Sequence, residues 1–317
     1  MQTLYSRCAG LDVHKESVVA CARVVAEGRV QREVQTFATT TAGLLRLRDW
    51  LVAHRCTHVG MEATGIYWRP VWHVLEGRFA LVLANAAQVR NVPGRKTDVN
   101  DAVWLADLLA HGLIRSSFVP PRPIQELRDL TRTRKQLVRQ VAQHTLRLQK
   151  TLEDAHLKIT GVVSDLLGVS GRAILQGLIE DENDPARLLA RTTGRLRTPR
   201  GRLLEGLQGM VTEHHRFLLH VHLEQIEAIQ RNIAALDARI VALIEPFRSQ
   251  VDLLITMPGV SHIVARVLVA EIGLDMSRFP TPGHLLSWAV SWLLDRSGAK
   301  LLRNRVLTKP CGGSVDD

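Results

Sequence analysis

The chain has 317 residues, and its 46% hydrophobic content supports a substantial core, which at 4% aromatic residues is mainly aliphatic. With 41 Lys and Arg against 31 Asp and Glu, the net charge of +10 favours nucleic acid as the acidic partner. No apolar run reaches the roughly 18 residues of a membrane span, and the N-terminus has no signal-peptide pattern. An anionic membrane surface is the less favoured acidic partner, and we expect a cytoplasmic protein without a membrane partner.

The cysteines are scattered along the chain without a C-x-x-C spacing: Cys8, Cys21, Cys56 and Cys311. This arrangement is typical of free thiols in a reducing compartment, and it argues against a zinc site or a disulfide framework.

The first third of the chain shows three short strand patterns followed by alternating helices and strands. The expected elements are strands at 4–12, 17–25 and 29–37, a helix after Thr39–Thr41, a strand at 57–62, a helix at 68–75, a strand at 78–84 and a helix at 99–109. By analogy, this order predicts an α/β domain of the RNase H-like class over residues 1–120.

Four carboxylates fall at the ends of these elements. Asp12 ends the first strand, Glu62 ends the fourth, and Asp98 and Asp101 open the helix after the fifth. Residues three apart on a helix face the same way. Strands one and four are neighbours in an RNase H-like sheet, so the four acids would converge. Such oxygen ligands suit Mg²⁺ or Mn²⁺, and two ions about 4 Å apart support phosphoryl transfer.

Each acid also has a simpler explanation. Asp12 could be a turn residue at a strand end, while Asp98 as N-cap and Asp101 in the first turn would both be favoured by the helix dipole. Taken singly, capping explains these two residues better. Glu62 is harder to explain, because Glu is seldom buried unpaired. As a set in this strand order, the four acids favour a metal site.

Three segments resemble the DEDD motif of one family of bacterial insertion-sequence transposases. They are Gly10-Leu-Asp-Val-His-Lys15, Glu62-Ala-Thr-Gly65 with Tyr67, and Lys96-Thr-Asp98 with Asp101-Ala102. The resemblance implies a RuvC-like N-terminal domain, a separate C-terminal transposase domain, DNA as substrate, guidance by a structured bridge RNA and a bacterial cytoplasm. It also implies that Asp12, Glu62, Asp98 and Asp101 are the catalytic, metal-binding tetrad.

Basic residues suggest where nucleic acid would bind. Arg95 and Lys96, just before the last motif, suit a nearby phosphate, although a solvated loop face explains them equally well. Beyond a break at Pro120–Pro123, a helix is expected over 124–155, and a second basic group lies in the partly looped segment 187–202. The predicted contacts are Arg128, Arg132, Lys135 and Arg139 on the helix and Arg195, Arg197 and Arg200 in the segment. A solvated helix face is the alternative.

A heptad-like seam runs through the helix expected over 211–244. Its seam positions alternate in steps of three and four and are apolar except for His222: Leu219, His222, Ile226, Ile229, Ile233, Leu236, Ile240 and Leu243. This pattern predicts a coiled coil, with either the 124–155 helix or another protomer as partner. We therefore expect a basic helical region over 121–248 and a homo-oligomer.

The last segment, 249–317, is predicted to be a small helical domain. Pro258-Gly259 precedes an Ala-rich helix and resembles a helix-hairpin-helix turn, in which Gly259 would approach a phosphate; an ordinary helix start is the alternative. Residues 253–289 resemble the family's C-terminal domain, and the resemblance stops at Val290. The family continues with a serine nucleophile, whereas here Ser297-Gly298 lacks the expected surroundings.

This loss suggests a frameshift or truncation after about residue 289. Translating the downstream DNA in the other two reading frames tests this hypothesis. If neither frame encodes a Pro-containing loop, a serine and a basic helix, the hypothesis is wrong and the tail is native.

The resemblance, together with the four acids, thus implies an RNA-guided transposase or site-specific recombinase that cleaves and exchanges DNA strands. One alternative is a metal-dependent structure-selective nuclease, in which water attacks the phosphate. The other is an inactive nucleic-acid-binding remnant.

Overall fold

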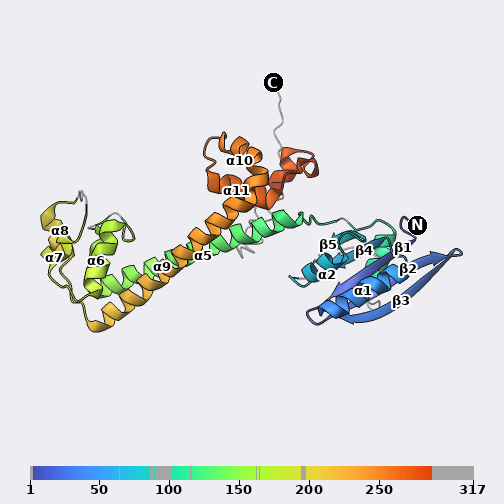
Figure 1. Ribbon diagram of the computed structural model, residues 1–317, viewed down its shortest axis with the longest axis horizontal. Coiled ribbons are helices and arrows are strands. Elements are labelled where there is room, and N and C mark those ends of the chain that lie inside the picture. The colour runs from blue at the N-terminus through green and yellow to red at the C-terminus, as the bar shows by residue number, and fades with distance from the viewer. Residues whose placement is uncertain are drawn as a thin grey trace, which may run out of the picture. The chain divides into compact units, whose positions relative to one another are not determined.

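The computed structural model describes residues 3–63, 65–85, 89, 101–114, 116–161, 163, 165–193 and 198–287. The chain forms two compact units, Met1–Val119 and Pro120–Asp317 (Figure 1). Among the described helices, none has both the length and the apolarity needed to cross a bilayer.

The first unit is a mixed α/β fold around a five-stranded sheet. Its elements are β1 (Arg7–Val13), β2 (Ser17–Ala26), β3 (Arg29–Ala38), α1 (Thr41–Ala53), β4 (His58–Glu62), α2 (Trp68–Leu75), β5 (Ala80–Ala84) and α4 (Asp101–Ala110). The strand order is β3-β2-β1-β4-β5, in which β1 pairs antiparallel with β2 and parallel with β4. This arrangement confirms the predicted mixed α/β class and is compatible with an RNase H-like domain.

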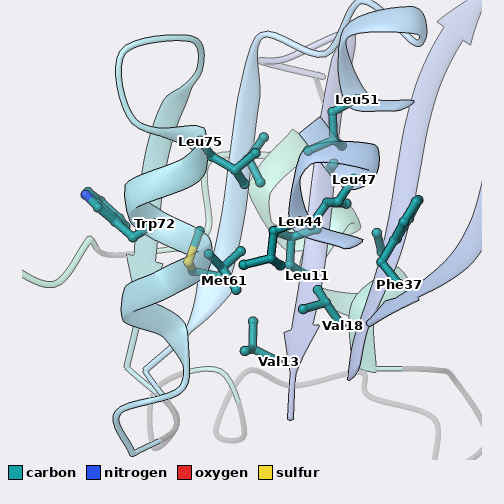
Figure 2. Packing of buried hydrophobic residues seen from close by; sticks show 14 of the residues in the cluster. Leu11, Val13, Val18, Phe37, Leu44, Leu47, Leu51, Met61, Trp72 and Leu75 are labelled. Carbon is teal, nitrogen blue, oxygen red and sulfur yellow. The ribbon is translucent and has the colours of Figure 1, made fainter. Parts of the chain in front are cut away.

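One face of the sheet carries the main core, which α1 and α2 cover (Figure 2). Helix α1 presents Leu44, Leu47 and Leu51, which recur at helical spacing and are fully or almost fully buried. Its first turn is fixed by Thr40, whose side-chain hydroxyl accepts a hydrogen bond of 3.2 Å from the Gly43 N–H. From the sheet, Leu11 and Met61 meet these leucines.

The other face of the sheet packs against α4 at unusually short range. Alternate residues of β1 point to this side, and one of them is Gly10. A Cβ atom built on Gly10 would lie 2.3 Å from the Ala102 carbonyl oxygen and 2.4 Å from the Ala106 nitrogen. Only a residue without a side chain lets the backbone of α4 lie directly on β1.

Strand β1 begins later than the sequence pattern suggested, at Arg7 rather than Leu4. The N–H groups of Leu4 and Tyr5 donate to the Ala110 carbonyl at 2.8 and 3.1 Å. These residues therefore satisfy an orphan acceptor at the C-terminal end of α4 instead of pairing in the sheet.

The second unit is entirely helical as far as it is described. Its elements are α5 (Arg122–Asp154), η1 (Ile159–Gly161), α6 (Val169–Ile179), α7 (Pro185–Ala190), α8 (Arg200–Gly206), α9 (Glu213–Ile244), η2 (Glu245–Phe247), α10 (Arg248–Ile255), α11 (His262–Ile272) and η3 (Met276–Arg278). Helices α5 and α9 run side by side and antiparallel (Figure 1). One core joins them to α6, α7 and α8, and another joins their opposite ends to α10 and α11.

The predicted seam of α9 faces inward. Leu219, Ile226, Ile229 and Ile240 are buried, and the remaining seam positions are half-buried. Helix α5 of the same chain packs along α9; a coiled coil in the strict sense, and pairing with another protomer, stay predictions. His222, the polar seam position, lies with its Nδ1 atom 3.3 Å from Nδ1 of His144 on α5.

We predict that Gly10→Ala destabilises the first unit by about 3 kcal/mol or more, because the new methyl group would meet backbone atoms that cannot move independently. Urea unfolding followed by tryptophan fluorescence measures the effect. Gly60→Ala is the matched control: Gly60 lies opposite Gly10 in the β1–β4 register, but its Cβ would meet only side-chain atoms at 3.3 Å or more. Equal stability of both variants would contradict the close α4–β1 contact.

A second prediction concerns pH. Burial, followed by the positive charges of His144 and Arg147, lowers the pKa of His222 below its ordinary value of 6.5. Below about pH 6.5 the unfolded chain therefore takes up a proton that folded His222 does not, so stability falls as pH falls, by at most about 1.4 kcal/mol per pH unit. His222→Gln should flatten the profile of unfolding free energy between about pH 7.5 and 5.5. His220→Gln, exposed on the same helix, should leave it unchanged, and identical profiles for all three proteins would contradict the prediction.

Candidate active site

Two of the predicted carboxylates end neighbouring parallel strands. In the β1–β4 ladder Gly10 lies opposite Gly60 and Leu11 opposite Met61, so Asp12 and Glu62 follow at the same end of both strands. Leu11 and Met61 belong to the core beneath α1 and α2. Because side chains alternate along a strand, Asp12 and Glu62 face the opposite side, where α4 packs.

Helix α4 brings the third carboxylate. Asp101 is its first residue, and the Gly10 contact holds this end of the helix close to β1. Further along α4, Asp107 accepts hydrogen bonds of 2.9 Å from Arg23 Nε on β2 and of 2.9 Å from an Arg32 guanidinium nitrogen on β3. Arg23 is 3% exposed, so this charge-assisted contact is shielded from water and fixes the helix on the sheet.

Asp12, Glu62 and Asp101 line one small cavity of about 30 Å³, enough for one or two water-sized species. The remaining lining residues are Leu11, Val89, Trp104 and Leu105. The structure therefore brings together three acids that lie far apart in the sequence. The fourth predicted acid, Asp98, and the basic pair Arg95 and Lys96 lie outside the described residues.

The cavity lining favours a hard divalent cation. Three carboxylates offer only oxygen donors, the ligand type preferred by Mg²⁺ and Mn²⁺. Within the described ranges, no three His, Cys, Asp or Glu side chains form a group that could hold a metal ion as they stand. One Asp12 oxygen lies 3.1 Å from the His14 Nε2 atom, so that carboxylate already has a neighbour two residues along the chain, which sequence reasoning did not single out.

The cysteines of the first unit play no part in this chemistry. Cys8, Cys21 and Cys56 are buried free thiols. Burial raises the pKa of Cys8 and of Cys21 to about 11 and that of Cys56 to about 12. The thiols stay protonated near neutral pH, which makes them poor nucleophiles and poor metal ligands.

Two family models match the sequence. The DEDD transposase model, described as Transposase, matches residues 9–157, and the model described as Transposase IS116/IS110/IS902 family matches residues 251–307. The chain belongs to the IS110-type transposase family. No curated protein matches the sequence closely enough to be named as a relative.

The two matches bear differently on the sequence-based expectations. The first spans Asp12, Glu62, Asp98 and Asp101, and it fits the transposase resemblance drawn from the three motifs. The second runs to residue 307, beyond Val290. The prediction that the family resemblance stops at Val290 is therefore wrong. Ser297 lies inside the matched range and outside the described residues.

Two of the arginines predicted to contact nucleic acid have partners within this transposase. Arg132 donates two hydrogen bonds, of 2.8 and 2.7 Å, to the carboxylate of Glu271 on α11. Glu271 is buried, with 5% of its surface exposed. Arg128 donates to the carbonyls of Ala270 and Glu271 at 3.0 and 2.9 Å. Both cations satisfy buried acceptors at the end of α11. They hold α11 to α5, and their contact with nucleic acid stays a prediction.

The other predicted nucleic-acid contacts also remain predictions. Lys135, Arg139 and Arg200 are exposed, while Arg195 and Arg197 lie outside the described residues. Gly259 is also exposed and has a φ of 83°, a conformation that favours glycine. It lies between α10 and α11, and the Ser261 side chain caps α11 by accepting a hydrogen bond from the Val264 N–H.

We predict that Arg132→Gln lowers the unfolding free energy by about 2 kcal/mol. The loss should be smaller than that of a fully buried ion pair because the Arg132 side chain is 25% exposed. Chemical denaturation and a nucleic-acid binding assay on the same variant separate the two roles. Lys135→Gln, one turn along α5 and exposed, is the control and should leave stability unchanged. Weaker nucleic-acid binding with unchanged stability in Arg132→Gln would instead indicate that Arg132 contacts a phosphate.

Proposed function

We propose that this transposase cleaves and exchanges DNA strands with the help of divalent metal ions held by Asp12, Glu62, Asp98 and Asp101. The observation that supports this most strongly is the convergence of Asp12, Glu62 and Asp101 on one cavity from β1, β4 and α4. A capping role explains Asp101 alone, but it does not explain why Asp12 and Glu62 line the same cavity.

The carboxylates have a defined task in this proposal. Carboxylate oxygens accept but do not donate hydrogen bonds and repel a bare phosphate, so a phosphodiester enters the site only together with cations. When bound, a pair of Mg²⁺ or Mn²⁺ ions supplies activation of the attacking oxygen and neutralisation of the leaving oxygen. Leu105, Val89 and Trp104 form the apolar part of the cavity lining.

The serine nucleophile and the guide RNA are part of the proposal because of the family resemblance. In this family a serine of the C-terminal domain attacks the DNA, and a structured RNA from the element selects the sites. Ser297 is the candidate here, because it lies within the second family match. We also propose that the protein acts as a homo-oligomer in the bacterial cytoplasm, with DNA and guide RNA as its partners.

A metal-dependent nuclease is a second candidate, supported by the lining of the cavity. Among the described residues that line it, none is a serine. Water attacking the phosphate would need no further side chain from the C-terminal helices, so the same carboxylates would suffice.

One assay distinguishes these functions: incubation of the full chain with guide RNA, Mg²⁺ and element-end DNA, followed by analysis for covalent protein–DNA adducts. We expect an adduct that disappears in Ser297→Ala, together with at least about a 100-fold loss of cleavage in Asp101→Asn. Asp49→Asn, at an exposed carboxylate of the same unit, should retain activity. Free cut ends without an adduct would favour the nuclease. The absence of both adducts and cut ends would indicate an inactive nucleic-acid-binding remnant.

A further inference from the structure

Trp104 brings a hydrogen-bond donor to the cavity of the three carboxylates. It lines this cavity together with Asp12, Glu62 and Asp101, and its Nε1 atom is buried without a hydrogen-bond partner among the described residues. Carboxylates and aliphatic side chains carry no N–H group, so the indole of Trp104 supplies the side-chain donor of the described lining. A site otherwise made of acceptors and apolar groups thus contains a donor that no described residue uses.

The position of Trp104 is fixed by its helix and by its neighbours. It follows Asp101 by three residues on α4, so both side chains lie on the same face of the helix. Its ring packs against an apolar cluster formed by Ala84, Val89, Leu105 and Leu108. The ring is therefore already ordered beside the carboxylates, and a ligand that contacts it pays little side-chain entropy.

An unpartnered indole N–H does not by itself indicate a ligand, as Trp72 shows. The Nε1 atom of Trp72 is also buried without a partner among the described residues, but this ring belongs to the core beneath α1 and α2, on the other face of the sheet (Figure 2). Trp72 does not line the carboxylate cavity. The difference between the two tryptophans is the cavity, which gives an incoming acceptor a place beside the ring of Trp104.

The unpartnered N–H of Trp104 is unfavourable in the free protein. A buried donor that has lost its water partners costs free energy until an acceptor replaces them. A phenylalanine would fill much of the same space without this cost. Because an acceptor that enters the cavity removes the cost, an indole at this position favours the ligand-bound protein over the free protein.

The chemistry of the cavity narrows the choice of acceptor. A metal cation accepts no hydrogen bond, so the N–H cannot be a ligand of the ions in the proposed function. The volume of about 30 Å³ admits one or two oxygen-sized species and excludes a whole base or sugar. A non-bridging oxygen of a phosphodiester meets both conditions, and its negative charge strengthens the hydrogen bond that it accepts.

We propose that the indole N–H of Trp104 donates a hydrogen bond to a non-bridging oxygen of the DNA phosphodiester in the carboxylate site. The contact orients the phosphate relative to Asp12, Glu62 and Asp101. The inference rests on the proposed function in taking DNA as the substrate of this site. It adds a direct contact with the substrate that the carboxylates cannot provide, because their oxygens only accept hydrogen bonds.

The test measures binding of element-end DNA to the full chain with guide RNA and Ca²⁺, a hard cation that also takes oxygen ligands. Trp104→Phe is the main variant. Trp72→Phe is the matched control, because it removes an N–H that is equally buried and unpartnered among the described residues. Replacement of Trp104 by benzothienylalanine, in which sulfur takes the place of the N–H, keeps the ring size and covers the case in which Trp104→Phe does not fold.

Both replacements of Trp104 should raise the dissociation constant for the DNA at least about fivefold, because one hydrogen bond to a charged group is lost. Trp72→Phe should bind the DNA like wild type. Titration of Mn²⁺ alone should give the same affinity for Trp104→Phe as for wild type, because an N–H is no ligand for a cation. This result separates a contact with the substrate from damage to the metal site.

A second measurement observes the N–H group itself. The chain has six tryptophans, and labelling their indole nitrogens with ¹⁵N gives each an N–H signal in the NMR spectrum. The signal of Trp104 is the one missing from Trp104→Phe or from the benzothienylalanine protein. Addition of the DNA with guide RNA and Ca²⁺ should move this signal downfield, as expected for an N–H that gains a hydrogen bond, and should leave the signal of Trp72 in place.

An unchanged dissociation constant in both Trp104 replacements, or a Trp104 signal that stays in place when DNA binds, would overturn the inference. A signal that Ca²⁺ alone moves to its final position would also overturn it, because the acceptor would then be metal-bound water. A wild-type chain that binds no element-end DNA would contradict both the inference and the proposed function. DNA binding with the Trp104 shift but without cleavage would contradict the proposed function alone, and cleavage indifferent to Trp104 would contradict the inference alone.

Discussion

The contact between α4 and β1 at Gly10 is the constraint on which the candidate site depends. Any side chain at this position would collide with the backbone of Ala102 or Ala106, so the helix can lie on the strand only because residue 10 has none. Asp12 follows two residues later on the same side of β1, and Asp101 opens the helix. Asp107, held by Arg23 and Arg32, fixes the other half of α4. The close backbone contact and the ion pairs of Asp107 with Arg23 and Arg32 thereby fix the position of Asp101 relative to Asp12.

A second constraint acts in the helical unit, where two long helices of a strongly basic chain stay packed together. Apolar seam positions of α9 are buried against α5, and two polar points, Arg134 with Asp237 and His144 with His222, fix their register. Two arginines of α5, Arg132 and Arg134, form ion pairs with acids of other helices, whereas Lys135 and Arg139 beside them are exposed. The acids that neutralise Arg132 and Arg134 come from distant parts of the sequence, and this separates these two arginines from the exposed cations beside them on the same helix.

Much of the fold follows from local pattern, whereas the roles of individual charges do not. The strand and helix order of residues 7–110 was predictable because β-branched runs, turns and helical spacing are local signals. The inclusion of Asp12 and Glu62 in one site was predicted from the strand order together with the analogy to an RNase H-like sheet, in which strands one and four are neighbours. The Glu271 contact of Arg132 could not be predicted, because 139 residues separate the partners. The helices α6, α7 and α8 were also not predicted; their short segments carry little periodicity and depend on a core shared with α5 and α9.

The central claim is that Asp12, Glu62 and Asp101, with Asp98, form a site for divalent metal ions. Calorimetric titration of Mn²⁺ into the full chain tests it most directly, since it requires neither DNA nor turnover. The account predicts saturable binding that Asp12→Asn weakens at least about tenfold, while Asp49→Asn, at an exposed carboxylate of the same unit, leaves it unchanged. Absence of saturable binding by the wild-type chain, or binding indifferent to Asp12, would contradict the account.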